Sequence, residues 1–219
     1  MSESPSSGDV RVLVTGTGTE VGKTWTLVRL VNELRARGRP VRARKPAQSY
    51  APDELGTTDA ELLAAATGED ATVVCPRHRW YECPMAPIMA ADALGRPPFT
   101  IAQLAAEVAD DGTEPGTVTL VEGAGGPRSP LASDGDIVDL ARALGCSRAV
   151  LVTDAGLGAI NAVRLCVETL HGFTTLVVLN RYDAGEDLHR RNRDWLESSG
   201  YLITTSIGAL ADALSALLP

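Results

Sequence analysis

Short apolar runs alternate along this chain with longer segments in which apolar residues recur every three or four positions. A short apolar run bounded by glycine, proline or polar residues is typical of a strand that is buried on both faces. We therefore predict strands over residues 11–15, 41–44, 117–121, 148–153, 174–179 and 201–205. The helical spacing predicts helices over residues 23–37, 58–67, 84–94, 101–109, 137–144, 159–170, 188–198 and 210–217.

This order of elements predicts an α/β fold with a mostly parallel sheet flanked by helices on both faces. No internal repeat or long linker interrupts it, so we expect residues 11–219 to form a single domain. Residues 1–10 are rich in Ser, Pro and Gly, and we expect them to be a disordered tail. Ligands of such sheets bind outside the carboxyl ends of the strands, where candidate residues should be sought.

Composition adds limits on possible partners. The chain has 219 residues, of which 44% are hydrophobic and 22% are charged, as in ordinary globular proteins. Its formal net charge of −8 disfavours nonspecific binding to nucleic acid or to an anionic membrane. The N-terminus lacks the basic start and apolar core of a signal peptide, and no apolar run is long enough for a membrane helix. We therefore expect a cytoplasmic protein without a nucleic-acid or membrane partner.

The first predicted strand is followed by Gly-Thr-Gly-Thr-Glu-Val-Gly-Lys-Thr at residues 16–24, and a predicted helix begins there. A glycine-rich turn between strand and helix lets backbone N–H groups surround phosphate oxygens, as in a phosphate loop. Gly16 and Gly22 are separated by five residues, one more than usual, so the loop is a variant. A dinucleotide fingerprint is the competing interpretation, but its spacing fails and it leaves Lys23 and Thr24 unexplained.

Further polar residues are expected at the same edge of the sheet. Lys45 follows the second strand, where it could neutralise phosphoryl charge, although a surface lysine fits the pattern equally well. Asp59 opens a helix; taken alone, capping by Thr58 or Asp59 is favoured over magnesium binding. Glu122 follows an apolar strand and precedes glycines, which favours a magnesium ligand opposite Thr24 over an incidental acid in a turn.

Two more strand ends offer ligand contacts. Gly-Leu-Gly-Ala-Ile-Asn at residues 156–161 opens a helix whose N-terminus could bind an anionic group. The alternative is a tight turn that places Asn161 in the first helical turn. Asn180 follows the next strand; its amide could read a base, because it has both a donor and an acceptor, or it could cap a loop.

In this order, the motifs resemble those of the dethiobiotin synthetase family. The matching segments are residues 16–24, 45–49, 58–60, 121–126 and 156–161. The variant spacing of the phosphate loop is itself a feature of that family. Two segments depart from the family pattern: Tyr50 stands where relatives usually have glycine, and residues 85–88 stand where many have Ser-Pro-His.

The resemblance implies a phosphate-loop NTPase fold and an ATP- and Mg²⁺-dependent enzyme of biotin biosynthesis that acts as a homodimer. Its substrates would be 7,8-diaminononanoate and CO2. One amine would capture CO2 as a carbamate, and the carbamate oxygen would attack the γ-phosphate. The second amine would then close the ureido ring of dethiobiotin and release phosphate, without a covalent enzyme intermediate.

The resemblance also implies roles for single residues. Those expected to act in catalysis are Lys23, Lys45, Thr19 and Ser49. Those expected to bind the nucleotide are Gly18, Thr19, Glu20, Val21, Gly22, Lys23, Thr24, Thr26, Glu122, Gly123, Gly125 and, facing adenine, Asn180. The expected magnesium ligands are Thr24, Asp59 and Glu122. The substrate would contact Lys45 and Ser49, and its carboxylate would be capped near a subunit interface by Gly158, Ala159, Ile160 and Asn161.

Two other functions remain open from the sequence. A related ATP-dependent enzyme that closes a ring or forms an amide on another small amine or acid would share the phosphate loop and Glu122. A dimeric nucleotide switch of the partitioning or targeting type would share the fold. Such switches usually carry a lysine early in the loop, where this chain has Thr15 and Thr17, so the switch is disfavoured.

Overall fold

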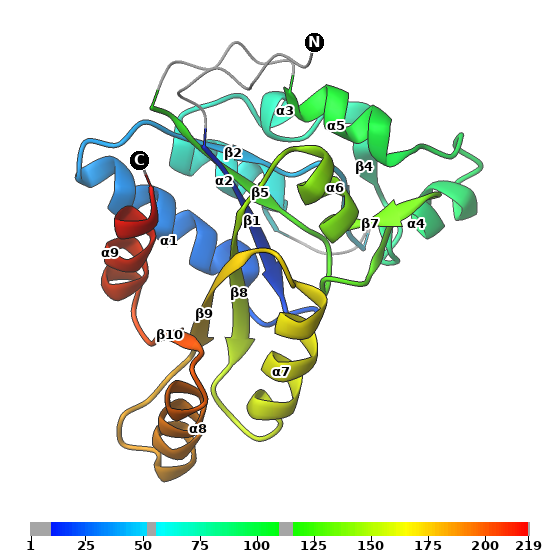
Figure 1. Cartoon of the computed structure of the whole chain (residues 1–219). Helices are drawn as coiled ribbons and strands as arrows, with labels where there is room; N and C mark the ends of the chain where they lie inside the picture. Colours follow the sequence, from blue (N-terminus) through cyan, green and yellow to red (C-terminus); the bar gives the residue numbers. More distant parts are fainter. Residues whose placement is uncertain (1–9, 52–55, 110–115, 219) are drawn as a thin grey trace, which may run out of the picture.

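The computed structural model describes residues 10–51, 56–109 and 116–218, with a parallel sheet through its centre (Figure 1). The strands lie in the order β10-β9-β8-β1-β5-β2, and each neighbouring pair is parallel. They are β1 (Val10–Gly16), β2 (Val41–Arg44), β5 (Val118–Glu122), β8 (Arg148–Asp154), β9 (Thr174–Asn180) and β10 (Leu202–Thr204). Parallel pairing brings all the carboxyl ends to one edge, so the polar residues that follow these strands become neighbours.

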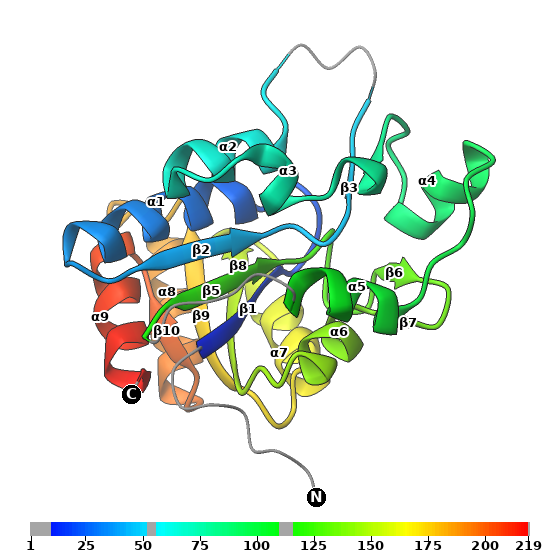
Figure 2. The ribbon, with the colours of Figure 1, turned by 90° about the horizontal axis from the view of Figure 1, so that it is seen from above.

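Helices cover both faces of the sheet, as Figure 2 shows from above. One face packs against α1 (Lys23–Ala36), α2 (Asp59–Thr67) and α9 (Ile207–Leu217). The other packs against α5 (Ile101–Ala109), α6 (Ile137–Ala143), α7 (Ala159–Thr169) and α8 (Asp187–Ser198). Strand side chains alternate between these cores: Val12 and Val14 of β1 face α1, whereas Leu13 faces the opposite core. The predicted α/β class is confirmed.

The predicted strands and helices are present, and local chemistry explains the shifts at their ends. α9 begins at Ile207, before the predicted residue 210, because the Ser206 hydroxyl caps it by accepting from the Ala209 N–H. α4 (Pro87–Ala93) begins after the predicted residue 84, because Pro87 occupies the first helical turn, where its missing N–H has no helical partner to lose.

Several short elements were not predicted. β3 (Gln48–Ser49) pairs with β4 (Trp80–Tyr81), and β6 (Pro130–Ala132) pairs with β7 (Gly135–Asp136). α3 (Ala71–Val74) and a 3-10 turn (Arg77–Arg79) lie between α2 and β4. Each has two to four residues, which is too short to show a period in the sequence. The pairing of β3 with β4 matters for the site, because it fixes the segment that follows Lys45.

β2 is an edge strand, and near its carboxyl end the N–H groups that point away from the sheet are hydrogen-bonded to other parts of the chain. The Glu69 carboxylate accepts from the Ala43 N–H at 3.2 Å, and the Lys45 N–H donates to the Val74 carbonyl at 2.8 Å. Arg44 holds Glu69 in place, with Nη1 and Oε1 2.7 Å apart. These contacts satisfy donors that would otherwise be free at the sheet edge. They also set the point at which Lys45 leaves the sheet.

The expectation of a disordered tail falls mostly on residues 1–9, which lie outside the described residues. For Val10 it is wrong, because Val10 begins β1 and pairs with Val118. That residues 11–219 form a single domain stays a prediction. Within the described ranges, no helix combines the length and the apolar character needed to cross a membrane.

Candidate functional site

The turn between β1 and α1 is held by a side chain from the end of β9. Gly22, directly before α1, has a φ of +88°, a left-handed conformation that favours glycine. The Asn180 amide donates from Nδ2 to the Val21 carbonyl at 2.9 Å. A Cβ added to residue 22 would collide with this Nδ2. Both the backbone conformation and the available space therefore require glycine at position 22.

Arg181, the residue after β9, makes a second side-chain contact with the same turn. Its Nη2 donates to the Glu20 carbonyl at 3.0 Å, and its Nη1 donates to Asp154 Oδ2 at 2.7 Å. Glu20 and Arg181 have φ values of 59° and 55°, which residues other than glycine seldom adopt. Such conformations persist where the surrounding contacts hold them. Contacts within the protein therefore support the shape of the turn.

Lys23, the first residue of α1, folds back over this turn. Its Nζ donates to the Gly18 carbonyl at 2.9 Å, and the residue is buried. Burial, together with the nearby Lys45 ammonium, lowers the pKa of Lys23 below its usual value. The free N–H groups of the helix start and the lysine together make an environment that favours a phosphate-sized anion.

Beside the turn, four side chains from different parts of the fold meet. Lys45 Nζ lies 2.7 Å from Asp59 Oδ2 and 2.7 Å from Glu122 Oε1. Thr24 Oγ1 lies 2.8 Å from Asp59 Oδ1 and 2.8 Å from Glu122 Oε1. A hydroxyl has one proton and can donate to only one of these carboxylates at a time. We call these four residues, Thr24, Lys45, Asp59 and Glu122, the carboxylate cluster.

Burial sets the charges within the carboxylate cluster. It raises the pKa of Glu122, which is fully buried, although the Lys45 ammonium opposes this effect. Burial alone would lower the pKa of Lys45, but Glu122 and Asp59 outweigh it and raise that pKa above its usual range. Lys45 in turn lowers the pKa of Asp59, whose side chain is 40% exposed. Each buried charge is therefore compensated by an opposite one.

The carboxylate cluster also has the donor atoms that magnesium prefers. Mg²⁺ binds oxygen ligands and usually keeps several waters and phosphate oxygens. Glu122 Oε2 is buried and has no hydrogen-bond partner among the described residues, which leaves one acceptor for a cation. No group of three or more His, Cys, Asp and Glu side chains suited to a metal occurs in the described part of the chain. A cation here would share its coordination between the two carboxylates, Thr24 and oxygens from outside the protein.

The start of α2 decides between the two interpretations of Thr58 and Asp59. Thr58 is the N-cap: its hydroxyl accepts from the Glu61 N–H at 3.4 Å, and the Glu61 carboxylate accepts from the Thr58 N–H at 2.8 Å. Asp59 is the first helical residue, and its carboxylate faces the cluster instead of capping the helix. Thr58 therefore has the capping role, and magnesium binding by Asp59 stays a prediction.

The two segments that set this chain apart from the family pattern lie next to each other. Ser49 Oγ donates to the Met85 carbonyl at 2.6 Å, which joins β3 to the start of residues 85–88. Tyr50 is partly buried against the core that contains α1 and α2, and its hydroxyl lies 3.4 Å from Glu82 Oε1. A contact of Ser49 with substrate stays a prediction.

A hollow of about 610 Å³ opens beside the phosphate loop, at the carboxyl edge of the sheet. Its walls come from the loop, from the segment after β5 and from α7, and include Gly18, Thr19, Gly125, Leu165 and Cys166. Arg128 is the one charged residue among the described residues that line it, and its Nη1 lies 2.6 Å from Asp136 Oδ2. The hollow combines an apolar wall with a single cation.

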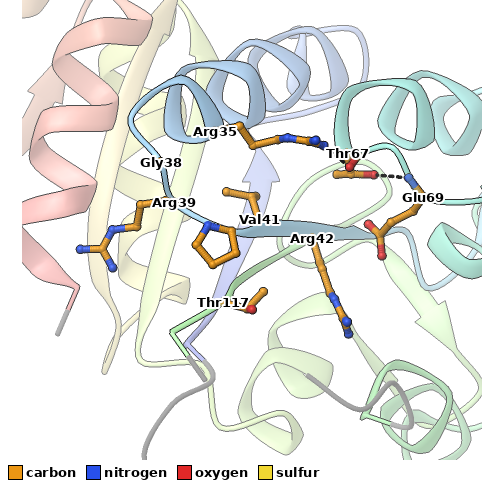
Figure 3. A pocket seen from close by; sticks show the side chains of 9 residues that line it. Arg35, Gly38, Arg39, Val41, Arg42, Thr67, Glu69 and Thr117 are labelled. Atoms are coloured by element: carbon orange, nitrogen blue, oxygen red, sulfur yellow. Dashed lines mark hydrogen bonds between the residues drawn. The ribbon is translucent and has the colours of Figure 1, made fainter. Parts of the chain in front are cut away.

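A second hollow, of about 460 Å³, lies at the opposite edge of the sheet (Figure 3). It is lined by Arg35, Arg39 and Arg42 and by Val41, the first residue of β2. Arg35 is already engaged with the end of α2, where Nη1 donates to the Ala66 carbonyl at 3.0 Å. Because ligands of parallel sheets bind at the carboxyl ends, we leave this hollow out of the candidate site.

The turn before α7 is supported by a residue that sequence reasoning missed. Asn192 of α8 donates from Nδ2 to the carbonyls of Ala155 and Gly156, at 2.9 and 2.8 Å. Gly158 caps α7 with a φ of +92°, and the preceding Leu157 is 94% exposed. Residues 158–161 do not belong to the carboxylate cluster or to the described lining of the 610 Å³ hollow.

Comparisons with known proteins identify the family. A family model described as "AAA domain" matches residues 10–208. The ATP-dependent dethiobiotin synthetase of Methylobacterium nodulans is 39% identical over 172 residues, which cover 73% of this chain and 74% of that protein. That of Haloferax mediterranei is 39% identical over 190 residues, which cover 84% and 77%. This chain belongs to the ATP-dependent dethiobiotin synthetase family.

Solved structures agree with the fold of this dethiobiotin synthetase family member. Chloroplast FtsY from Physcomitrella patens is 16% identical with a TM-score of 0.53, over 95% of this chain and 66% of that chain. Cobyrinic acid a,c-diamide synthase from Mycobacterium smegmatis, with bound ADP and magnesium, is 16% identical with a TM-score of 0.51, over 94% of each chain. At such low identity these likenesses show the fold alone.

Of the residues to which the family resemblance assigns roles, the structure brings the loop, Lys23 and the carboxylate cluster together at the carboxyl edge of the sheet. Asn180 lies against the loop, where its Nδ2 is already used. Two contacts to the site were missed besides that of Asn192. Arg181 directly follows Asn180, and Gln48 lies within the matching segment 45–49, but their partners, Glu20 and Ala60, are set by tertiary structure that a motif does not display.

We expect Gly22→Ala to destabilise this chain by about 1–3 kcal/mol even without nucleotide, because it combines a left-handed backbone with a collision against Asn180. Gly18→Ala is the matched control, since no atom lies within 4 Å of its added Cβ. Urea denaturation of both variants measures the difference. Equal stability of the two variants would contradict the packing described here.

Proposed function

We propose that this chain uses ATP and magnesium to carboxylate 7,8-diaminononanoate and close it to dethiobiotin. The carboxylate cluster carries the proposal: Lys45 and Thr24 meet Asp59 and Glu122 directly beside the phosphate loop. ATP dependence follows from the family. The relatives' function favours this reaction over other ring-closing enzymes and over a nucleotide switch.

In this reaction the protein binds and orients the substrates and neutralises their negative charge, and it supplies no nucleophile. Lys23 and Lys45 place two ammonium groups beside the loop, where they stabilise oxygens of the carbamate and of the phosphoryl group that it attacks. Thr19 lies next to the transferred phosphate, and Ser49 orients the diamine. Holding the carbamate and the phosphoryl group in line makes the attack effectively intramolecular.

Thr24, Asp59 and Glu122 are the residues that would hold magnesium. When bound, the ion neutralises phosphate charge during transfer. Glu122 Oε2, which has no partner in the part of the chain that the structure describes, and the two carboxylates around one hydroxyl support this assignment. Lys45 opposes the effect of burial on the pKa of Glu122 and so favours the charged form, which is the form that binds a cation.

The surroundings of the loop suit the remaining parts of the two substrates. With Nδ2 of Asn180 fixed on Val21, its Oδ1 is left to accept from the adenine amine. The nucleotide would also contact Glu20, Thr26 and Gly123 from the loop, from α1 and from the segment after β5. The hollow that Leu165 lines has an apolar wall suited to the aliphatic chain of the diamine.

The substrate carboxylate is assigned to residues 158–161 of a second copy of the chain. These residues stand apart from the site within one copy, and Leu157 beside them is 94% exposed, so this surface is accessible to a second copy. We therefore propose a homodimer in which the start of α7 of one copy completes the site of the other. CO2 as second substrate and a cytoplasmic location belong to the same proposal.

The deciding experiment measures phosphate release with ATP, magnesium and bicarbonate, with and without 7,8-diaminononanoate. Mass spectrometry of the product checks for the added carbonyl. Diamine-dependent release with a ring-closed product is the expected result. ATP hydrolysis that ignores the diamine would reject the proposed reaction.

We expect Lys45→Ala to lower kcat by about a hundredfold or more, because it removes a cation from the reacting oxygens. Arg39→Ala, which removes a cation at the opposite edge of the sheet, is the control and should change kcat by less than about twofold. Steady-state kinetics on variants shown to be folded by circular dichroism measures this. An unchanged kcat for Lys45→Ala would remove Lys45 from the reaction.

We expect Glu122→Gln to raise the magnesium concentration for half-maximal activity by at least about tenfold, since loss of a supporting contact alone costs that much. Glu107→Gln removes a carboxylate that pairs with Arg79 and does not belong to the carboxylate cluster, and it serves as the control. Activity titrated with magnesium gives both midpoints. Superimposable curves would exclude Glu122 as a ligand.

We expect Leu157→Asp to weaken self-association by at least about tenfold, because it puts a charge into the proposed interface. Leu94→Asp, at an exposed leucine that ends α4, is the control. Analytical ultracentrifugation measures both dissociation constants. A monomeric wild type, or a Leu157→Asp variant that dimerises normally, would rule out this interface.

A further inference from the structure

Gln48 connects the segment that carries Lys45 with the helix that carries Asp59. It is the first residue of β3, three positions after Lys45, and it is 3% exposed. Its Oε1 accepts from the backbone N–H of Ala60 at 3.0 Å. Ala60 is the second residue of α2, directly after Asp59. One side-chain bond therefore joins the two segments whose charged groups meet in the carboxylate cluster.

The orientation of the Gln48 amide is fixed by its surroundings. If the amide were turned over, its NH2 group would face the Ala60 N–H, and two donors would oppose each other. In the orientation observed, Nε2 is buried without a hydrogen-bond partner among the described residues. Within the described ranges, the bond to Ala60 is thus the one polar contact that holds this side chain, and it is kept although it leaves a buried donor unsatisfied.

This bond acts at the point where Asp59 is positioned. The first N–H groups of a helix have no partner within the helix. The Thr58 hydroxyl accepts from the N–H of Glu61, and the Gln48 amide, which belongs to β3, accepts from the N–H of Ala60. The Asp59 side chain is 40% exposed, so burial does not hold it in place. Its reach to Lys45 and Thr24 depends on where the first turn of α2 lies.

We propose that Gln48 is a positioning residue: by holding the first turn of α2 against the segment of Lys45, it sets the Asp59 carboxylate for magnesium-nucleotide binding. The proposal rests on the proposed function for its meaning in catalysis. Binding of magnesium and ATP, however, needs no diamine. The two proposals can therefore fail separately.

The test compares Gln48→Met, which keeps the volume but removes the acceptor, with Gln48→Asn, which keeps the amide but is too short to reach Ala60. Binding of a non-hydrolysable ATP analogue is measured by calorimetry over a range of magnesium concentrations. Both variants should raise the magnesium midpoint by about tenfold, as expected for loss of an outer contact to a ligand. Nucleotide binding without magnesium should change by less than about twofold.

Thr58→Ala is the matched control, because it removes a different cap from the same end of α2. If loosening of the helix were the cause, Thr58→Ala would shift the magnesium midpoint as much as the Gln48 variants, and the proposal would be wrong. We expect Thr58→Ala to lower thermal stability while the midpoint stays within about twofold of wild type.

A double-mutant cycle with Asp59→Asn shows whether Gln48 acts through Asp59. In the Asp59→Asn background, Gln48→Met should shift the magnesium midpoint by less than about twofold, because the group it positions is gone. Independent, multiplicative effects would overturn the proposal. If wild type binds magnesium and ATP but does not turn over the diamine, the proposed reaction fails while this comparison still stands.

Discussion

Lys45 and Glu122 face each other at 2.7 Å at the ends of the neighbouring strands β2 and β5, and both side chains are almost fully enclosed. An unpaired charge in such a place costs several kcal/mol, so each of the two residues stabilises the other. The parallel register of the two strands brings the charges together. Asp59 and Thr24 are then arranged around this pair, which makes it the anchor for α2 and for the start of α1.

The phosphate loop depends on the sheet in a comparable way, through backbone carbonyls rather than charges. Asn180 and Arg181, at the end of β9, bind the carbonyls of Val21 and Glu20. These contacts reduce the conformational freedom of the loop, which lowers the entropy cost of ordering it around a ligand. Lys23 and Lys45 balance Asp59 and Glu122 in number, so an incoming phosphate meets a site without a large net charge.

Much of this arrangement could be predicted from the sequence, because it follows from periodicity and from the rule that parallel strands end at one edge. The loop, Lys45 and Glu122 were placed correctly at that edge, and the fold class and family are confirmed. The roles of the single residues stay predictions. For Asp59, the sequence taken alone favoured a cap over a magnesium ligand, because a carboxylate at a helix start often caps it; the structure gives the cap to Thr58. The two-residue strand that carries Gln48 and the partners of Arg181 depend on long-range contacts that leave no local pattern.

The closed edge of the sheet has a consequence for how copies of the chain can assemble. At the carboxyl end of β2, the N–H groups of Ala43 and Lys45 are taken by Glu69 and Val74. A strand from another molecule would find these donors occupied and could not continue the sheet there without breaking the contact that precedes Lys45. If strands of several copies paired through this edge, they would therefore disrupt the segment that carries Lys45 into the site. Assembly and an intact site are compatible only when copies meet through a different surface.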